Sequence, residues 1–343
     1  MNIQGRTMHA LGAIFALGLS ILLLTSTFMS SAAPSADLQP GLPVRAAFYY
    51  PWFPEAWKQQ GIEPYTNYHP SLGFYSLSDQ TMVRQHIDAM QYGGIQVGIA
   101  SWWGQGSATD QRLPLLLTAA APTTFRWSIY YEPESQGDPS LSTLSADLTY
   151  LRDHYGSDPS LLRIDGRLVV FVYADASDGC GMVERWTQAN SVNAYLVLKV
   201  FAGYRSCARQ PDGWHQYAPA SAADAQDQFS YTISPGFNQA GGAFCLGRDL
   251  ARWKSNIRDM IASGARFQLI TTFNEWGEGT AVESAQEWAS ASGYGAYLDA
   301  LHNNGQAELS PSPTADLSHS DNWLPIVRGT SNPQCSDTNS ARP

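Results

Sequence analysis

The sequence predicts a single α/β domain built as a (β/α)8 barrel of the TIM type. Short apolar segments rich in β-branched residues alternate with amphipathic segments of helical length from residue 44 to residue 302, and this alternation favours a parallel sheet with helical connections. The 343 residues suffice, since such barrels commonly need about 250. Conspicuous polar and aromatic side chains follow the predicted strands directly, where barrel enzymes place their active sites.

Seven strands are predicted from short runs of Val, Ile, Leu, Phe and Tyr. They are residues 44–50, 95–101, 125–131, 167–174, 195–202, 229–234 and 267–273. The eighth strand is not evident, and residues 323–327 are its only late candidate. Residues 203–225 are rich in small side chains, which predicts a long loop that shapes a substrate groove.

Six helices are predicted between these strands from the spacing of their apolar residues. They are residues 78–92, 110–120, 141–155, 182–190, 248–263 and 289–302. Ser78 is the expected N-cap of the first helix. Residues 248–263 give the clearest pattern, with Trp253, Ile257 and Met260 on one side.

The amino terminus has the pattern of a secretory signal. Arg6 precedes an apolar stretch at residues 10–24, and small residues at 31–33 resemble a cleavage site. An uncleaved membrane anchor is the alternative, because the apolar run continues to residue 29. Both predictions place the rest of the chain outside the cytoplasm, and the first predicts a secreted protein.

The expected organisation follows from these segments. It consists of a signal peptide or anchor at 1–33, a linker at 34–43, a catalytic domain at 44–329 and a disordered tail at 330–343. We expect a monomer that contacts a membrane only if the first segment is not cleaved.

Charge and cysteine content narrow the function further. The net charge is −10 and Lys and Arg form no cluster, which argues against nucleic acid as a partner. Four cysteines suit an oxidising compartment. Cys180 and Cys207 each follow a predicted strand and would lie on neighbouring loops, so we expect the pairs Cys180–Cys207 and Cys245–Cys335. The cysteine spacings match no zinc site, and no metal is predicted.

The stretch at residues 267–283 carries the strongest functional signal. A buried strand ends in Asn274, Glu275, Trp276, Gly277, Glu278 and Gly279. In a tight turn, side chains three residues apart point the same way, and Gly277 and Gly279 allow such a turn. We therefore expect Glu275 and Glu278 to share one pocket. Paired carboxylates with unequal pKa values are typical of glycoside hydrolysis, whereas a solvated acidic turn is the simpler alternative.

This stretch resembles the signature of glycoside hydrolase family 99, the endo-α-1,2-mannosidases and mannanases. The family pattern is approximately [ST]-[ST]-F-N-E-W-H-E-G-T-Q-I-E. The residues that match are Phe273, Asn274, Glu275, Trp276, Glu278, Gly279, Thr280 and Glu283. Gly277 replaces the family histidine, Ala281 replaces glutamine and Val282 replaces isoleucine.

Further motifs at strand ends are similar to those of the family. They are FYYPWF at the first strand, SWWG at the second, an EP pair at the third and SPGF at the sixth. The candidate substrate-binding residues are Tyr50, Trp52, Trp102, Trp103, Glu132, Tyr173, Asn274, Trp276 and Glu283. Aromatic rings of this kind stack on the apolar faces of sugars, although many of them would serve equally well in a core.

The resemblance implies a retaining hydrolase that cleaves internal α-linkages of a polysaccharide or oligosaccharide. Glu275 would deprotonate the sugar 2-hydroxyl, and Glu278 would be the acid/base. Direct nucleophilic attack by Glu275 is the alternative mechanism. No cofactor is expected, because carboxylates supply the proton transfers.

Three other functions stay open from the sequence. They are an α-glucanase of a neighbouring barrel family, a carbohydrate-binding barrel without catalysis, and a glycosyl transferase. The export signal argues against a transferase that would need cytoplasmic nucleotide sugars, and the two retained glutamates argue against a binding barrel.

Overall fold

The computed structural model describes residues 39–175, 177–306 and 335. All of them belong to one compact unit. The predicted signal peptide, residues 34–38 of the linker, the candidate strand at 323–327 and the tail at 330–343, apart from Cys335, lie outside the described residues.

Eight parallel strands form the central sheet. In chain order they are β1 Val44–Tyr49, β2 Val97–Trp102, β3 Arg126–Tyr131, β5 Arg167–Val172, β6 Tyr195–Lys199, β7 Gly213–His215, β9 Ser230–Ile233 and β12 Phe267–Ile270. Two antiparallel strands extend it, β4 Arg163–Ile164 on β5 and β8 Ala223–Gln226 on β9. A separate hairpin pairs β10 Phe237–Asn238 with β11 Phe244–Leu246.

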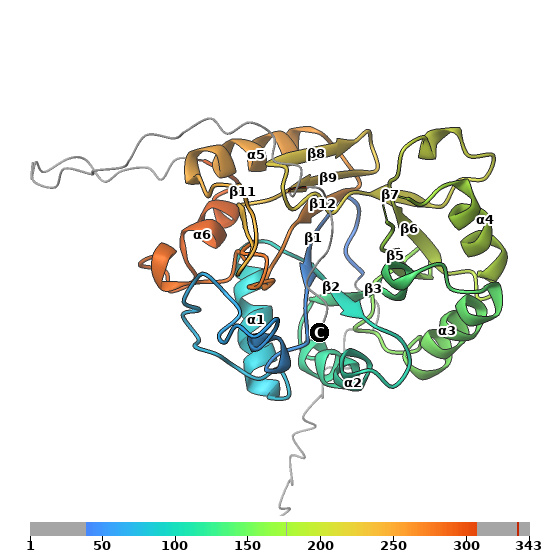
Figure 1. Ribbon diagram of the computed structural model, residues 1–343, viewed down its shortest axis with the longest axis horizontal. Coiled ribbons are helices and arrows are strands. Elements are labelled where there is room, and N and C mark those ends of the chain that lie inside the picture. The colour runs from blue at the N-terminus through green and yellow to red at the C-terminus, as the bar shows by residue number, and fades with distance from the viewer. Residues whose placement is uncertain (1–38, 176, 307–334, 336–343) are drawn as a thin grey trace, which may run out of the picture. The chain divides into compact units, whose positions relative to one another are not determined.

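The parallel strands follow one another in the order β7-β6-β5-β3-β2-β1-β12-β9, which brings the two ends of the chain of strands together (Figure 1). The first strand β1 pairs with the last strand β12 along Val44↔Phe267 to Ala47↔Ile270. Between β7 and β9 the ring closes by side-by-side packing rather than a ladder. The Thr232 hydroxyl donates to the Gln216 carbonyl across this gap (2.6 Å). The predicted α/β barrel is therefore confirmed.

The parallel strand that the sequence analysis did not identify is β7. It lies inside the segment that was predicted to be a loop. It has only three residues, Gly213 to His215, too few to show a strand pattern. The predicted sixth strand is consequently the seventh of the barrel, β9, and the glutamate pair follows the eighth strand, β12. The prediction that the pair ends strand seven is wrong for this reason.

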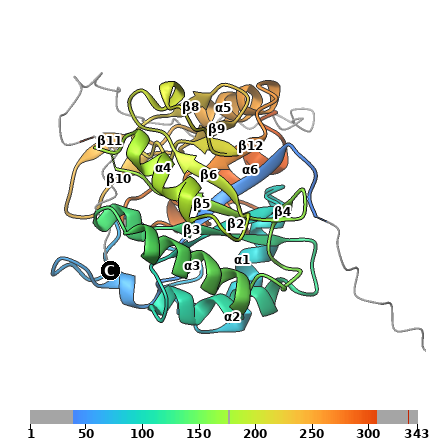
Figure 2. The same cartoon turned by 90° about the vertical axis from the view of Figure 1, so that its right-hand side faces the viewer.

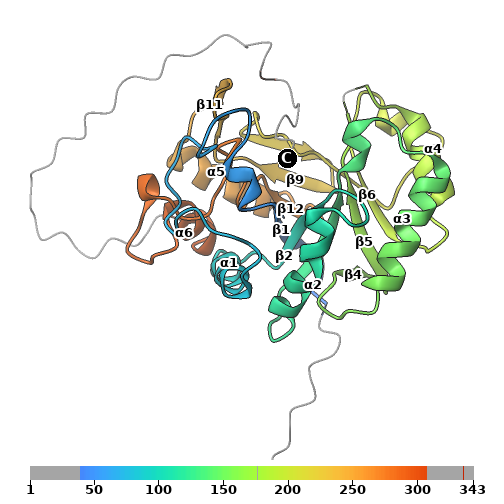
Figure 3. The same ribbon diagram turned by 60° about the horizontal axis from the view of Figure 1, so that its bottom comes forward.

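Within the described residues, six α-helices occupy the predicted connections. They are α1 Gln80–Tyr92, α2 Ala108–Ala120, α3 Leu141–His154, α4 Cys180–Ala189, α5 Leu250–Ala262 and α6 Ala296–His302. Single 3-10 turns are η1 Glu55–Trp57, η2 Pro133–Gln136, η3 Tyr204–Ser206 and η4 Gln286–Trp288. The helices lie outside the strands, with α3 and α4 covering the outer side of β5 and β6 (Figures 2 and 3).

Most helix starts lie within two residues of the prediction, but the cap of α1 and the start of α6 differ. Asp79, not Ser78, caps α1, because its carboxylate accepts from the Thr81 amide (2.8 Å). The last helix begins at Ala296 rather than 289, since Gly293 and Gly295 adopt positive φ angles of 83° and 86° that interrupt a helix.

Aromatic rings fill much of the barrel interior. Phe48 of β1 contacts the rings of Tyr130 and His215 at centroid distances of 4.9 and 5.8 Å. Phe171 of β5 meets Phe267 of β12 at 5.2 Å. Burial, together with the nearby Lys199 charge, lowers the pKa of His215 to about 3, so this core histidine is neutral.

Both predicted disulfides are present, Cys180–Cys207 and Cys245–Cys335. The first joins the segments that follow the neighbouring strands β5 and β6. The second attaches Cys335 to the β10–β11 hairpin. These bonds are typical of an oxidising compartment. Each helix within residues 39–306 is too short or too polar to span a bilayer.

Gly98 is required by a close approach on the outer side of the barrel. It pairs with Trp127 across β2 and β3, and a Cβ at residue 98 would lie 2.2 Å from Trp127 Cζ3. We expect Gly98→Ala to lower the free energy of unfolding by about 1–3 kcal/mol or more through overpacking, measured by urea denaturation. Gly181→Ala is the control, because its Cβ meets no atom within 4 Å. Equal stability of the two variants would contradict the packing argument.

Candidate active site

Asn274 joins the end of β12 to the end of β1. Its Oδ1 accepts from the Tyr50 amide (2.8 Å), and its Nδ2 donates to the Tyr50 carbonyl (3.0 Å). Asn274 is fully buried. The two hydrogen bonds satisfy backbone groups that leave the sheet here, so they bring Tyr50 and the glutamate turn to the same end of the barrel.

The turn at residues 272–280 places the two glutamates together. The Glu275 amide donates to Thr272 Oγ1 (2.8 Å), and the Glu278 amide donates to Glu275 Oε1 (3.3 Å). The Gly279 amide donates to the Trp276 carbonyl (3.1 Å). Gly279 has a φ of +69°, which favours glycine, but Gly277 is not in this region. Both glycines were expected to allow the turn by adopting positive φ, and only Gly279 does so.

The backbone of this turn is fixed from outside as well. The Ala240 amide donates to the Gly277 carbonyl (2.8 Å), and the Asn238 amide donates to the Glu278 carbonyl (2.9 Å). Arg248 Nη2 donates to the carbonyls of Gly279 (2.9 Å) and Ala281 (2.5 Å). The segment around β10 and β11 therefore holds the turn in place.

Three buried carboxyl groups meet at this end of the barrel. Glu275 is 1% exposed, and Glu278 and Glu132 are not exposed. Burial raises the pKa of Glu275 well above its usual range, and the negative charge of Glu278 adds to this effect. Glu275 Oε2 is buried and has no hydrogen-bond partner among the described residues. This oxygen therefore has unused capacity to accept a hydrogen bond.

Glu132 follows β3 and belongs to the same cluster. Burial raises its pKa to about 8; a hydrogen bond from Ser101 opposes the increase, the charge of Glu278 adds to it, and Lys199 opposes it. Lys199 is itself buried on β6, where its Nζ donates to the Ala174 carbonyl (3.0 Å) and lies over the Tyr173 ring (4.9 Å). Tyr173 thus contacts the cluster through Lys199.

A chain of hydroxyl groups leads to Glu278. Tyr217 donates to Glu278 Oε2 (2.8 Å), and Tyr50 donates to the Tyr217 hydroxyl (3.0 Å). The Trp52 ring stacks on Tyr50 at a centroid distance of 4.5 Å. Tyr217 was not among the predicted site residues, because it lies just after the short strand β7 in a segment without a strand pattern.

Most of the other predicted site residues direct their polar atoms to protein groups away from the carboxyl cluster. Trp102 donates to Asp110 of α2 (2.8 Å). Trp276 donates to Glu283 (3.1 Å), whose other oxygen lies 3.3 Å from His86 Nε2. Trp103 is half-buried, and its buried Nε1 has no hydrogen-bond partner among the described residues. The structure therefore gathers Glu275, Glu278, Glu132, Tyr50 and Trp52, and places the polar atoms of Trp102, Trp276 and Glu283 in separate contacts.

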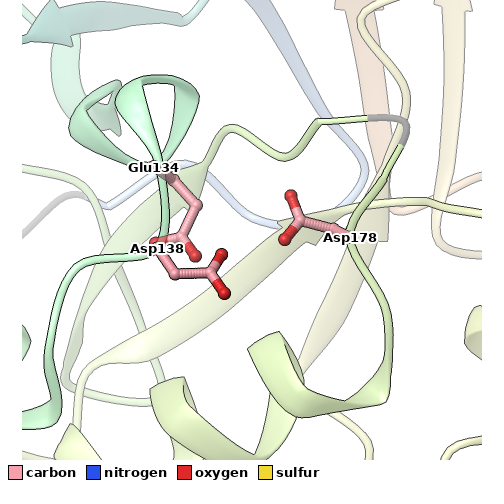
Figure 4. Close-up of side chains that lie close together, drawn as sticks. All are labelled: Glu134, Asp138 and Asp178. Atoms are coloured by element: carbon pink, nitrogen blue, oxygen red, sulfur yellow. The ribbon is translucent and has the colours of Figure 1, made fainter.

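A second acidic cluster lies beside η2 and α4. One oxygen each of Glu134, Asp138 and Asp178 lies within 4.8 Å of the others (Figure 4). Arg185 forms ion pairs with Glu134 and Asp138, the latter at 3.0 Å, and Trp186 donates to Glu134 (3.0 Å). Because Arg185 already supplies a positive charge there, we assign no metal to this cluster.

The first half of the sequence resembles a known protein family. The model of glycosyl hydrolase family 99 matches residues 46–191. Glycoprotein endo-alpha-1,2-mannosidase of Mus musculus is 28% identical over 108 residues, covering 30% of this chain and 23% of that protein. The same enzyme of Xenopus laevis is 26% identical over 266 residues, covering 64% and 58%. The chain thus spans less than two thirds of the length of these curated relatives.

Solved structures extend the likeness to most of the barrel. The GH99 endo-alpha-mannosidase of Bacteroides thetaiotaomicron is similar with a TM-score of 0.60 and 21% identity, covering 78% of this chain and 96% of that chain. A structure described as a glycoside hydrolase-like protein has a TM-score of 0.54 and 15% identity, covering 82% and 98%. Both likenesses support the barrel fold.

The raised pKa of Glu132 predicts a pH-dependent stability. A carboxyl whose pKa is raised in the folded state stabilises the fold below its unfolded pKa, and this contribution is lost as pH rises to about 8. Glu132→Gln should therefore gain stability relative to wild type between pH 5 and pH 8.5, by at most about 1.4 kcal/mol per pH unit. Urea denaturation at both pH values measures it. The control is Glu63→Gln, at an exposed carboxylate, which should not change the pH dependence of stability. If Glu132→Gln also leaves this dependence unchanged, the pKa of Glu132 is not raised.

Proposed function

We propose that this chain is a glycosidase of glycoside hydrolase family 99 or of a family-99-like group. We propose further that it cleaves internal α-linkages of mannose-containing glycans with retention of configuration. The observation that carries the proposal is the burial of Glu275 and Glu278 in one turn at the carboxyl end of β12. Two relatives named endo-alpha-1,2-mannosidase support mannose as the sugar.

The first step uses Glu275 as a base. Its ionised carboxylate takes the proton of the sugar 2-hydroxyl, and the freed oxygen attacks the anomeric carbon of the same ring. The glycosidic bond breaks, and the leaving oxygen takes the proton of Glu278. A raised pKa strengthens Glu275 as a base. Direct attack of Glu275 on the anomeric carbon is the alternative first step.

The second step opens the resulting 1,2-anhydro sugar. Glu278, now ionised, takes a proton from water, and the water oxygen attacks the anomeric carbon. The bond between that carbon and the sugar 2-oxygen breaks, and Glu275 returns its proton to this oxygen. Two inversions give net retention. Tyr217 supports this role because its hydroxyl donates to Glu278 Oε2 and limits rotation of the carboxylate (2.8 Å).

The remaining site residues fall into two groups. We assign sugar binding to the residues beside the carboxyl cluster, namely Tyr50, Trp52, Glu132 and Tyr173. We assign it also to Trp103, whose buried Nε1 has no hydrogen-bond partner among the described residues. We assign a positioning role to Trp102, Asn274, Trp276 and Glu283, because their polar atoms already contact protein groups. None of these roles requires a cofactor, since carboxylates and hydroxyls carry the protons.

The cellular setting follows from the disulfides and the amino terminus. Two disulfides suit an oxidising compartment, and we propose that the protein is secreted and acts as a monomer on its glycan. An α-glucanase is the second candidate function, because Gly277, between the two glutamates, departs from the family pattern.

The test of the function is a product assay on a panel of α-mannans and α-glucans, with Glu275→Gln as the blank. We expect oligosaccharides from α-mannan with retained anomeric configuration, determined by NMR at early times. Release of oligosaccharides from α-glucan alone would favour the second candidate function, an α-glucanase. Binding without release from either polymer would exclude the glycosidase.

The acid role of Glu278 predicts a dependence on the leaving group. Glu278→Gln should reduce turnover of a substrate with a poor leaving group by about 10²- to 10⁴-fold and spare most turnover of an activated aryl glycoside. Glu275→Gln should be inactive on both substrates. Steady-state kinetics on the two substrates measure this, with Glu287→Gln as the control for loss of a carboxylate at a surface position. Equal losses on both substrates for Glu278→Gln would contradict the role.

A further inference from the structure

Gly277 is a glycine because of what lies against it, not because of its backbone angles. Its φ is not positive. A Cβ at this residue would lie 2.7 and 2.8 Å from Cε1 and Cδ1 of the Tyr65 ring, and 2.9 Å from Glu275 Oε1. Real Cβ atoms do not approach other atoms so closely, so the Tyr65 ring occupies the space that a side chain at residue 277 would need.

The Tyr65 ring is held in this place from three directions. Its amide donates to the Trp57 carbonyl (2.8 Å). Its hydroxyl accepts from Gln60 Nε2 (3.0 Å) and, at 3.5 Å, from Gln239 Nε2 beside β10. The residue is 1% exposed. The ring therefore has little freedom to move aside.

The Glu275 carboxylate borders the same space beside Gly277 as the Tyr65 ring. Its Oε1 accepts a long hydrogen bond from the Glu278 amide (3.3 Å), and its Oε2 has no hydrogen-bond partner among the described residues. Few hydrogen bonds thus set the orientation of the group that we assign as the base. The space beside Gly277 is bordered by both the Tyr65 ring and Glu275 Oε1, so a group that enters this space meets the carboxylate.

We propose that Tyr65 is a positioning residue for Glu275, in which the aromatic ring packs over Gly277, restricts the carboxylate to its catalytic orientation and excludes water from the turn. The catalytic role of this orientation rests on the proposed function, whereas the contact between Tyr65 and Gly277 does not. Gly277 and Tyr65 act as one unit, because the ring fits only where residue 277 has no side chain.

The electrostatic surroundings of Glu275 make the effect measurable. The titratable groups that face it from the neighbouring elements are Glu278, Glu132, Tyr50, Tyr217 and Tyr65. Water admitted by loss of the ring would stabilise the ionised carboxylate. The pKa of Glu275 should then fall toward its ordinary value.

The first part of the test is a double-mutant cycle in kcat on the α-mannan substrate. Gly277→Ala should reduce kcat at least about tenfold with little change in KM, because a shift of this carboxylate misaligns the base. In the Tyr65→Ala background the same Gly277→Ala substitution should cost less than about threefold, since the ring no longer opposes it. Tyr65→Phe, which keeps the ring, should retain activity close to that of wild type. Equal costs in both backgrounds would overturn the proposal.

The second part needs no substrate and therefore separates this proposal from the proposed function. The titration of Glu275 is followed by NMR of ¹³C-labelled glutamate carboxyls, with the signal assigned by Glu275→Gln. Tyr65→Ala should lower the measured pKa by about one pH unit or more through hydration, and Tyr65→Phe should not. An unchanged pKa in Tyr65→Ala would overturn the role of Tyr65 even if the wild-type protein is an active mannosidase.

Controls exclude a general loss of stability. Tyr92→Ala removes a ring that stacks on Tyr294 at 4.3 Å, on the outer side of α1, and should lower Tm without changing kcat or the Glu275 titration. If Tyr65→Ala does not fold, Tyr65→Leu removes the ring and keeps apolar volume. If the wild-type chain hydrolyses no glycan, the proposed function fails, and the titration still decides whether Tyr65 controls Glu275.

Discussion

The backbone of the glutamate turn is held by hydrogen bonds from three separate parts of the chain, and the candidate site depends on this arrangement. Asn274 binds both backbone groups of Tyr50 on the β1 side. Amides near β10 bind the carbonyls of Gly277 and Glu278, and Arg248 binds that of Gly279. Each bond satisfies a buried peptide group beyond the end of β1 or of β12. The two carboxylates can therefore stay close together although their charges repel.

Burial of three carboxyl groups is unfavourable for folding, and the barrel compensates for it. Desolvation raises the pKa of Glu132 to about 8, so protonation of this carboxyl group removes part of the cost. The rest is offset by packing of aromatic rings below the site, including Phe48, Tyr130 and Phe171. A rigid core beneath a strained polar end is the usual arrangement in enzymes that hold carboxyl groups with unequal pKa values.

The segments that complete the site come from the least regular parts of the chain. The three-residue strand β7 directs Tyr217 to Glu278. The loop after β1 brings Tyr65 against Gly277. The β10–β11 hairpin supplies amide donors to the turn and is linked to Cys335 by a disulfide. Loops thus orient groups that the strands place at one end of the barrel, in accordance with the general division of labour in this fold.

The sequence by itself determined the barrel class, seven of its eight parallel strands and the juxtaposition of Glu275 and Glu278, because each depends on local periodicity or on spacing within one turn. The disulfide Cys180–Cys207 followed from the order of the strands, which places the loops that carry the two cysteines side by side. The tertiary structure alone decided that β7 closes the barrel, that Tyr217 donates to Glu278 and that Tyr65 excludes a side chain at Gly277. These contacts join residues far apart in the chain, and nothing in the local pattern of either partner specifies which distant surface it will meet.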